Sequence, residues 1–178
     1  MGSCWKICEI MIKLLIFSDN HRDREVVYKM LSANKDVDHI ISLGDSEMSE
    51  SELSNLNIIG VKGNYPFEPK FPYDLELTFG NFRILFTHGH HFNVKSGDIQ
   101  IYHFAKDHDC QIACFGHTHM YSITDYEDIV LVNPGSLTYP KMHPNKTYGL
   151  ISLLKNQFQI DIIDVDTLET VKTYTKYL

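Results

Sequence analysis

MIKLLIFSDNH, residues 11–21, joins a near-continuous apolar run to the polar cluster Asp19-Asn20-His21. Such a run is typical of a strand that is covered on both faces, as in a parallel sheet flanked by helices. Residues 22–33 follow, with Val26, Val27 and Met30 at helical spacing. The stretch therefore predicts a β-α unit whose strand ends in side chains that can bind a cation.

The same arrangement, an apolar run followed directly by a polar cluster, occurs four more times. The runs are 39–43, 58–61, 82–87 and 111–115, and the clusters after them are Gly44-Asp45, Gly63-Asn64, His88-Gly89-His90-His91 and Gly116-His117-Thr118-His119. In open α/β sheets the active crevice lies at the carboxyl ends of the strands. We therefore expect these carboxylate, amide and imidazole groups to converge on one site.

The order of elements predicts an α/β fold. The first half alternates strands 11–17, 37–43 and 56–61 with a helix at 22–33 and a short helix or loop at 46–53, which implies parallel strands and right-handed crossovers. A loop at 65–72 precedes the second half, which runs strand upon strand. Its predicted strands are 74–79, 81–86, 111–115, 121–126, 129–132, 147–154 and 157–164, with a helix at 96–107 and turns at Gly80-Asn81 and Lys155-Asn156. Because the sequence shows no internal repeat or linker, we expect residues 11–178 to form one domain and residues 1–10 to be an N-terminal extension.

Four of the five clusters, taken singly, have another explanation, whereas the three histidines of His88-Gly89-His90-His91 rarely serve packing alone. Asp19 or Asn20 suits the N-cap of the following helix. Asp45 and Asn64 are common turn residues, and the His117/His119 pair suits a solvated strand end. The scattered His39, His103, His108 and His143 are expected to be ordinary polar residues. One metal site explains why all five clusters directly follow strands better than five separate coincidences do.

Bulk composition limits the function. A formal net charge of -7 argues against a dedicated binder of long nucleic acids, which usually has a basic face. No apolar stretch reaches the length that spans a bilayer. Four cysteines are too few for a disulfide framework. The pairs Cys4/Cys8 and Cys110/Cys114 could be imagined as a zinc site, but 110–115 alternates as a buried strand does, so reduced thiols and a cytoplasmic location are expected.

The clusters, in this order, resemble the signature of the calcineurin-like metallophosphoesterases. Four motifs are similar in sequence to those of the small, single-domain phosphodiesterase branch: Ser18-Asp19-Asn20-His21, Thr87-His88-Gly89-His90, Gly116-His117-Thr118-His119 and Asn133-Pro134-Gly135-Ser136. The resemblance runs from about Met11 to near the C-terminus. It implies a four-layer α/β/β/α sandwich of two mixed sheets, with helices on the outside and a metal pair at one edge.

The resemblance also implies roles for the clusters. The expected ligands of the first cation are Asp19, His21, Asp45 and His119, and those of the second are Asn64, His88 and His117, with Asp45 bridging. His90 and Asn64 are the expected catalytic residues, and Asn133–Ser136 a supporting turn. His91 has no role in the family pattern. Mixed oxygen and nitrogen ligands suit manganese, which we expect, and also iron, zinc, cobalt or nickel.

The implied activity is hydrolysis of a small or activated phosphodiester by a hydroxide that two divalent cations activate. The family often has a histidine or acidic residue after the Gly-Asn ligand, whereas this chain has Tyr65-Pro66. Proton donation to the leaving group would fall to His90, to a metal-bound water or to no group. Two alternatives remain: a phosphomonoesterase acting on nucleotides or phosphoproteins, for which Arg22, Arg24 and Lys141 are the nearby cations, and a non-catalytic protein-binding scaffold of the same fold. The expected partner is a small phosphoester, and a homo-oligomer is compatible with the sequence.

Overall fold

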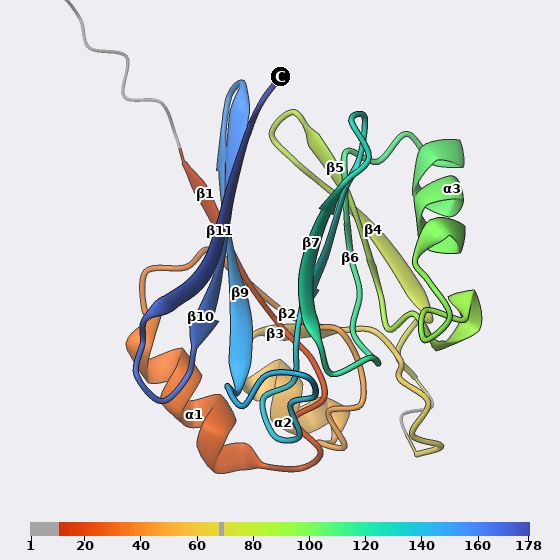
Figure 1. Cartoon of the computed structure of the whole chain (residues 1–178). Coiled ribbons are helices and arrows are strands. Elements are labelled where there is room, and N and C mark those ends of the chain that lie inside the picture. The colour runs from red at the N-terminus through yellow and green to blue at the C-terminus, as the bar shows by residue number, and fades with distance from the viewer. Residues whose placement is uncertain (1–10, 68–69) are drawn as a thin grey trace, which may run out of the picture.

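The computed structural model describes residues 11–67 and 70–178 (Figure 1). The predicted extension at residues 1–10, with Cys4 and Cys8, lies outside the described residues. In chain order the elements are β1 (Ile12–Phe17), α1 (Arg24–Ala33), β2 (His39–Ser42), α2 (Glu50–Asn55), β3 (Ile58–Gly60), β4 (Asp74–Phe79), β5 (Phe82–Thr87), the 3-10 helix η1 (His90–Phe92), α3 (Ile99–Asp107), β6 (Ile112–Cys114), β7 (Tyr121–Asp125), β8 (Val130–Pro134), β9 (Thr147–Leu154), β10 (Gln157–Asp164) and β11 (Thr170–Tyr177).

Two mixed sheets pack face to face. The first has the strand order β11-β10-β9-β1-β2-β3, and the second has the order β4-β5-β6-β8-β7. Strands β1, β2 and β3 run parallel, as do β5, β6 and β8. Helices α1 and α2 cover the outer face of the first sheet, and α3 covers that of the second (Figure 1). This confirms the predicted four-layer α/β/β/α sandwich.

Alternation along β1 shows why the run at residues 12–17 is apolar throughout. Leu14 and Ile16 are buried between the two sheets, whereas Leu15 and Phe17 are buried against the helices on the outside. A period of two places successive side chains on opposite faces, so a strand that is buried on both faces needs no polar position. The central strand β1 is therefore a rigid support for the first polar cluster, which directly follows it.

Most predicted elements are confirmed, within a few residues at their ends. The predicted helix at 22–33 begins only at Arg24, because Asp23 is its N-cap and accepts a hydrogen bond from the Val26 amide. The N-cap explanation for Asp19 and Asn20 is therefore wrong. Strand β11 was not predicted at all, because its sequence is polar and its side chains are exposed or only partly buried.

Candidate metal centre

All five polar clusters meet at one end of the sandwich, the lower end in Figure 1. Three clusters follow the parallel strands β1, β2 and β3 of the first sheet, and two follow the parallel strands β5 and β6 of the second sheet. Parallel strands bring their carboxyl ends to the same edge, and the packing of the two sheets brings both edges together. The predicted convergence is confirmed.

The loops of the site hold an unusual backbone conformation. Positive φ angles occur at Asp19, His21, Arg22, Asp45, Glu47, His117 and His119. Three parallel hydrogen bonds join the first two loops: Asp19 N donates to Gly44 O, His21 N to Asp45 O and Arg22 N to Ser46 O, at 3.2, 3.2 and 2.8 Å. Non-glycine residues in the left-handed region cost free energy and gather at functional sites. This conformation aims side chains that a regular strand would direct elsewhere.

Glycines in two clusters are required by close packing at the site. A Cβ on Gly63 would lie 2.0 Å from Asp45 Oδ1, and one on Gly116 would lie 1.9 Å from Ser18 Oγ. Any larger residue would displace the loop that carries an expected ligand. The Gly-Asn and Gly-His pairs in the sequence therefore reflect loops that pass in contact with each other.

The first group of potential ligands consists of Asp19, His21 and His119. His119 Nε2 lies 3.1 Å from Asp19 Oδ1, and His21 Nε2 lies 3.9 Å from the same oxygen and 3.5 Å from His119 Nε2. Ligands that share one divalent ion lie about 3 to 4 Å apart, because each bond to the ion is about 2 Å long. These three atoms have the spacing of ligands to one cation.

A second group consists of Asp19, Asp45 and His88. His88 Nε2 lies 3.6 Å from Asp45 Oδ2 and 4.0 Å from Asp19 Oδ1. The same nitrogen lies 3.3 Å from Asn64 Oδ1 and 3.2 Å from His117 Nδ1. All seven predicted ligands therefore lie in one cluster. Asp19 belongs to both groups, whereas Asp45, the predicted bridging ligand, belongs only to the second.

Three of the histidines are oriented by acceptors on the side away from the cluster. The Nδ1 atoms of His21, His88 and His119 lie 2.9 Å from Glu47 Oε1, 2.7 Å from Leu43 O and 2.8 Å from Tyr139 O, respectively. A proton on Nδ1 leaves the lone pair of Nε2 for a metal. Such outer partners fix both the tautomer and the direction of a ligating ring.

Asp19 is the best test of whether these residues fit a cation. It is fully buried, and its Oδ1 accepts no hydrogen bond from any described residue. Burial opposes its ionisation, but the close imidazoles of His119 and His88 hold the pKa of Asp19 below its ordinary value. A buried carboxylate that stays ionised with a bare oxygen aimed at imidazoles fits a metal ion well.

The remaining histidines differ in their surroundings. His90 lies beside the cluster, with ring centroids 5.4 Å from His88 and 6.1 Å from His117. Burial, with the charges of His88 and His91, lowers the pKa of His90 to about 4, so its ring is neutral at pH 7. His91 packs on Tyr73 with ring centroids 4.4 Å apart. The role of His90 as a proton donor stays a prediction.

The 133–136 segment supports the cluster from below. Asn133 Nδ2 donates to Gly116 O and to Thr118 Oγ1, at 2.9 and 3.0 Å. Ser136 Oγ donates to Asp19 O at 2.9 Å. These bonds hold the backbone of two ligand loops, which is the supporting role predicted for this turn.

Sequence reasoning missed the residues that surround the ligands. Glu47 and Tyr139 orient histidines, and Lys62, Lys95 and Lys141 lie near enough to act electrostatically on His90, His117 and His119. Lys141 was recognised as a nearby cation, but Lys62 and Lys95 were not. Nothing in the local sequence around these residues marks them, because their role arises only from the meeting of loops.

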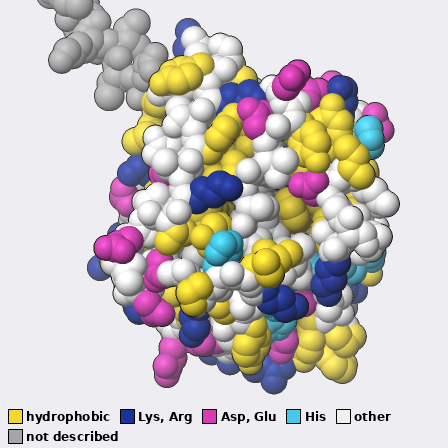
Figure 2. Space-filling view, in the orientation of Figure 1, with side chains coloured by type: hydrophobic (Ala, Val, Ile, Leu, Met, Phe, Trp, Pro, Cys, Tyr) yellow, Lys and Arg dark blue, Asp and Glu magenta, His cyan; other side chains and the backbone are white. Residues whose placement is uncertain are grey.

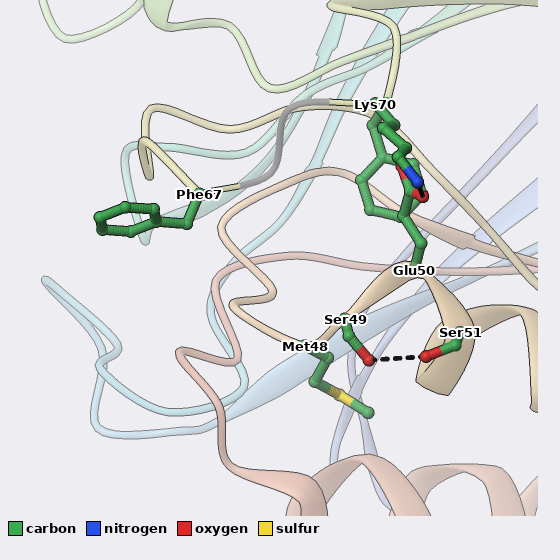
Figure 3. Close-up of a pocket in the computed structure, with 7 residues that line it drawn as sticks. Met48, Ser49, Glu50, Ser51, Phe67 and Lys70 are labelled. Atoms are coloured by element: carbon green, nitrogen blue, oxygen red, sulfur yellow. Dashed lines mark hydrogen bonds and ion pairs between the residues drawn. The ribbon is translucent and has the colours of Figure 1, made fainter.

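A cavity of about 310 Å³ lies between the start of α2 and the residues Phe67, Lys70 and Phe71. Met48, Phe67 and Phe71 are its apolar lining residues, and Ser49, Glu50, Ser51 and Lys70 its polar ones (Figure 3). Lys70 Nζ lies 3.4 Å from Glu50 Oε2. Phe67 packs edge-on against Tyr65, the residue after Asn64, with ring centroids 5.5 Å apart. The cavity thus adjoins the loop that carries a predicted ligand.

The described cysteines, Cys110 and Cys114, are buried free thiols, and burial raises the pKa of both. They lie at and beside β6 and do not belong to the two ligand groups. Within residues 11–67 and 70–178, no helix has the length and apolar character to cross a bilayer.

Comparison with known proteins agrees with this geometry. Residues 12–156 match the model of the calcineurin-like phosphoesterase superfamily domain. The probable metallophosphoesterase YsnB of Bacillus subtilis is 31% identical over 143 residues, which cover 80% of this chain and 85% of that protein.

Two solved structures share the fold. A conserved protein of Streptococcus pneumoniae TIGR4, a predicted phosphoesterase, superimposes with a TM-score of 0.86 at 24% identity and covers 95% of this chain and 99% of its own. Zinc-bound Vps29 of Entamoeba histolytica gives a TM-score of 0.73 at 18% identity, covering 93% of this chain and 99% of its own. The match over residues 12–156, with the 31% identity to YsnB, shows that the chain belongs to the calcineurin-like phosphoesterase superfamily.

Proposed function

We propose that the chain is a metal-dependent phosphodiesterase that hydrolyses a small or activated phosphodiester directly, without a covalent intermediate. The observation that carries the proposal is the bare, buried Asp19 Oδ1 facing the Nε2 atoms of His119, His21 and His88 at 3.1 to 4.0 Å. Two divalent cations, with manganese as the proposed activating ion, would supply an acidified water and positive charge toward the phosphoryl oxygens.

The chain's own residues prepare this chemistry. Asp19, His21, Asp45 and His119 would hold one cation, and Asn64, His88 and His117 the other. Burial and the charge of His88 lower the pKa of His117 to about 4, so the ring is neutral at pH 7 and one of its two nitrogens carries no proton. His90 lies at the rim of the cluster, where it can orient a phosphoryl oxygen or the attacking water.

The charge distribution supports a small-molecule substrate. On the described part of the face in Figure 2, Lys and Arg side chains are interspersed with acidic and apolar ones and form no continuous basic surface. A small phosphoester, rather than a long nucleic acid, is the proposed partner. The buried thiols Cys110 and Cys114 support a cytoplasmic location.

A phosphomonoesterase is the second candidate. Lys62, Lys95 and Lys141 act electrostatically on His90, His117 and His119, respectively, and such cations favour the additional negative charge of a monoester. The scaffold alternative is supported by the fold shared with Vps29. A protein-binding scaffold does not need metal ligands. The complete set of candidate ligands in this chain therefore weighs against the scaffold alternative.

The test compares bis(p-nitrophenyl) phosphate with p-nitrophenyl phosphate as substrates of metal-stripped protein, before and after manganese is added. Metal-dependent diester turnover that is lost in Asp45→Ala supports the proposal. Asp128→Ala is the matched control, because Asp128 pairs with Lys106 at 2.8 Å, outside the ligand groups. Faster monoester turnover would favour the second candidate, and metal binding without turnover of either ester would favour the scaffold.

A further inference from the structure

Arg22 directly follows the ligand His21, and its side chain is held at the rim of the site. Arg22 Nη2 lies 2.8 Å from the Tyr65 hydroxyl and 3.5 Å from Glu47 Oε2. Tyr65 in turn directly follows the ligand Asn64, and its backbone amide donates to Asp45 Oδ1 at 2.9 Å. Residues adjacent to ligands of both proposed cations therefore meet and fix one guanidinium above the cluster.

The backbone of Arg22 is unfavourable by itself. Its φ angle is 67°, and the hydrogen bond from its amide to Ser46 O holds this conformation. A bulky residue is rarely found there, so an observed outlier of this kind points to a function. Arg24, two residues later, is in the regular helix α1 and donates to Glu52 Oε1 at 2.6 Å. Of the two arginines, only Arg22 is directed toward the site.

The guanidinium still has donors for a ligand. Arginine has five N–H donors in a rigid fork, and among the described residues Arg22 contacts only Tyr65 and Glu47 through its guanidinium. Its side chain is 56% exposed. The fork geometry suits a carboxylate or phosphate, which it can bind through two parallel hydrogen bonds.

The contacts of Arg22 place its guanidinium outside the two ligand groups. Glu47 Oε1 contacts Nδ1 of His21, whereas Nε2 of the same ring faces the cluster. The imidazole of His21 and the carboxylate of Glu47 therefore separate the guanidinium from the ligand atoms. A group that reaches Arg22 lies farther out than the phosphoryl group under attack.

We propose that Arg22, positioned by the Tyr65 hydroxyl, is a specificity-determining residue that binds a second anionic group, a carboxylate or a phosphate, on the non-reacting part of the substrate. The proposal rests on the proposed function, because it places the reacting phosphoryl group at the dimetal cluster. It narrows the substrate class to phosphoesters that carry two separated negative groups.

The test measures binding rather than turnover. The manganese-loaded protein is titrated by calorimetry with phenylphosphonate, 4-carboxyphenylphosphonate and 1,4-benzenediphosphonate, which cannot be hydrolysed and differ only in the second group. We expect the better of the two probes that carry a second anionic group to bind about tenfold tighter than phenylphosphonate, the usual effect of a charged hydrogen-bonded pair. The preferred probe tells a carboxylate from a phosphate.

Variants assign that preference to one side chain. The affinity of the preferred probe divided by that of phenylphosphonate should fall to about one in Arg22→Met. This ratio should be partly retained in Arg22→Lys. It should also decrease in Tyr65→Phe, although the charge of Arg22 remains. Arg24→Met removes the same charge two residues away and should keep the full ratio. Metal content measured for each variant distinguishes a loss of metal binding from a loss of the preference for a second anionic group.

Equal binding of the three probes to the original protein, or a preference that persists in Arg22→Met, would overturn the inference. An equal loss in Arg24→Met would do the same, because it would reduce the effect to bulk charge. Failure of the proposed function has a different signature: the nitrophenyl esters are not hydrolysed, although the probes still bind with the Arg22-dependent preference.

Discussion

His119 Nε2 lies 3.1 Å from Asp19 Oδ1, although one residue follows β6 of the second sheet and the other follows β1 of the first. The contact therefore joins the two sheets at the edge where their parallel strands end. Burial alone would lower the pKa of His119, but the adjacent Asp19 carboxylate raises it above the ordinary value. Both residues belong to the first group of potential ligands, so the contact brings side chains of both sheets within reach of one cation.

Asp19→Asn should reduce manganese affinity by at least about 100-fold, since it removes a charged ligand shared by both groups while keeping the side-chain shape. At a manganese concentration of about 100 times Kd, the original protein gains about 2.7 kcal/mol of stability, and the variant should gain almost none. Thermal unfolding with and without manganese measures this difference. Asp161→Asn, on β10, is the control. An undiminished manganese-induced rise in Tm in Asp19→Asn would exclude this residue as a ligand.

Glu47→Gln should lower metal affinity by about 10- to 100-fold without touching a ligand directly. The charge of Glu47 holds the Nδ1 proton of His21 and so keeps Nε2 available to a metal. Glu50→Gln is a matched control three residues later, because Glu50 contacts Lys70 instead. Competition with a chelator gives the two affinities, and equal values for the two variants would contradict the orienting role of Glu47.

Gly63→Ala should destabilise the protein by about 1 to 3 kcal/mol and also weaken metal binding, because the new methyl group would overlap Asp45. Gly80→Ala should cost about 1 kcal/mol for its positive φ angle but leave metal binding unchanged, since Gly80 lies in the β4–β5 turn. Denaturant unfolding and metal titration of both variants separate strain from loss of the ligand. If Gly63→Ala kept full metal affinity, the prediction would be wrong, because the loop would have relaxed around the new methyl group without displacing Asp45.

Much of this architecture could be predicted, because ligands that directly follow apolar strands leave a mark in the sequence. The seven predicted ligands do gather. Arg22 was predicted within a helix, because a left-handed residue held by Ser46 O leaves no local signal. The orienting contact of Glu47 depends on a neighbouring loop, and β11 depends on pairing with β10, so neither is visible in its own segment.

His90→Asn should lower kcat by about 100-fold with manganese content unchanged, within the range usual for a group that handles a proton or orients a reacting atom. His91→Asn is a matched control in the adjacent position, where the ring packs on Tyr73. Steady-state kinetics with the nitrophenyl diester measures the effect. Equal kcat values for both variants would remove His90 from the catalytic residues.

The stability of the metal-free protein should depend on pH mainly through His90 and His117. Their pKa values are lowered by burial to about 4 in the folded protein, against an ordinary value of 6.5, so the unfolded chain binds more protons between these limits. Stability therefore rises with pH across that window and is lost as the pH falls from about 6.5 to 4. The raised pKa of His119 acts in the opposite sense, because its contribution is full below pH 6.5 and is lost as the pH rises through the folded value.

Tm measured in chelator from pH 4 to 8 should therefore climb to a maximum near pH 6.5. His117→Gln should flatten the acidic limb, because the glutamine does not titrate. His103→Gln, in helix α3 away from the cluster, should leave the limb unchanged. An acidic limb of the same slope in His117→Gln would mean that other groups cause the acid sensitivity, and that His117 is not held neutral by its buried place beside His88.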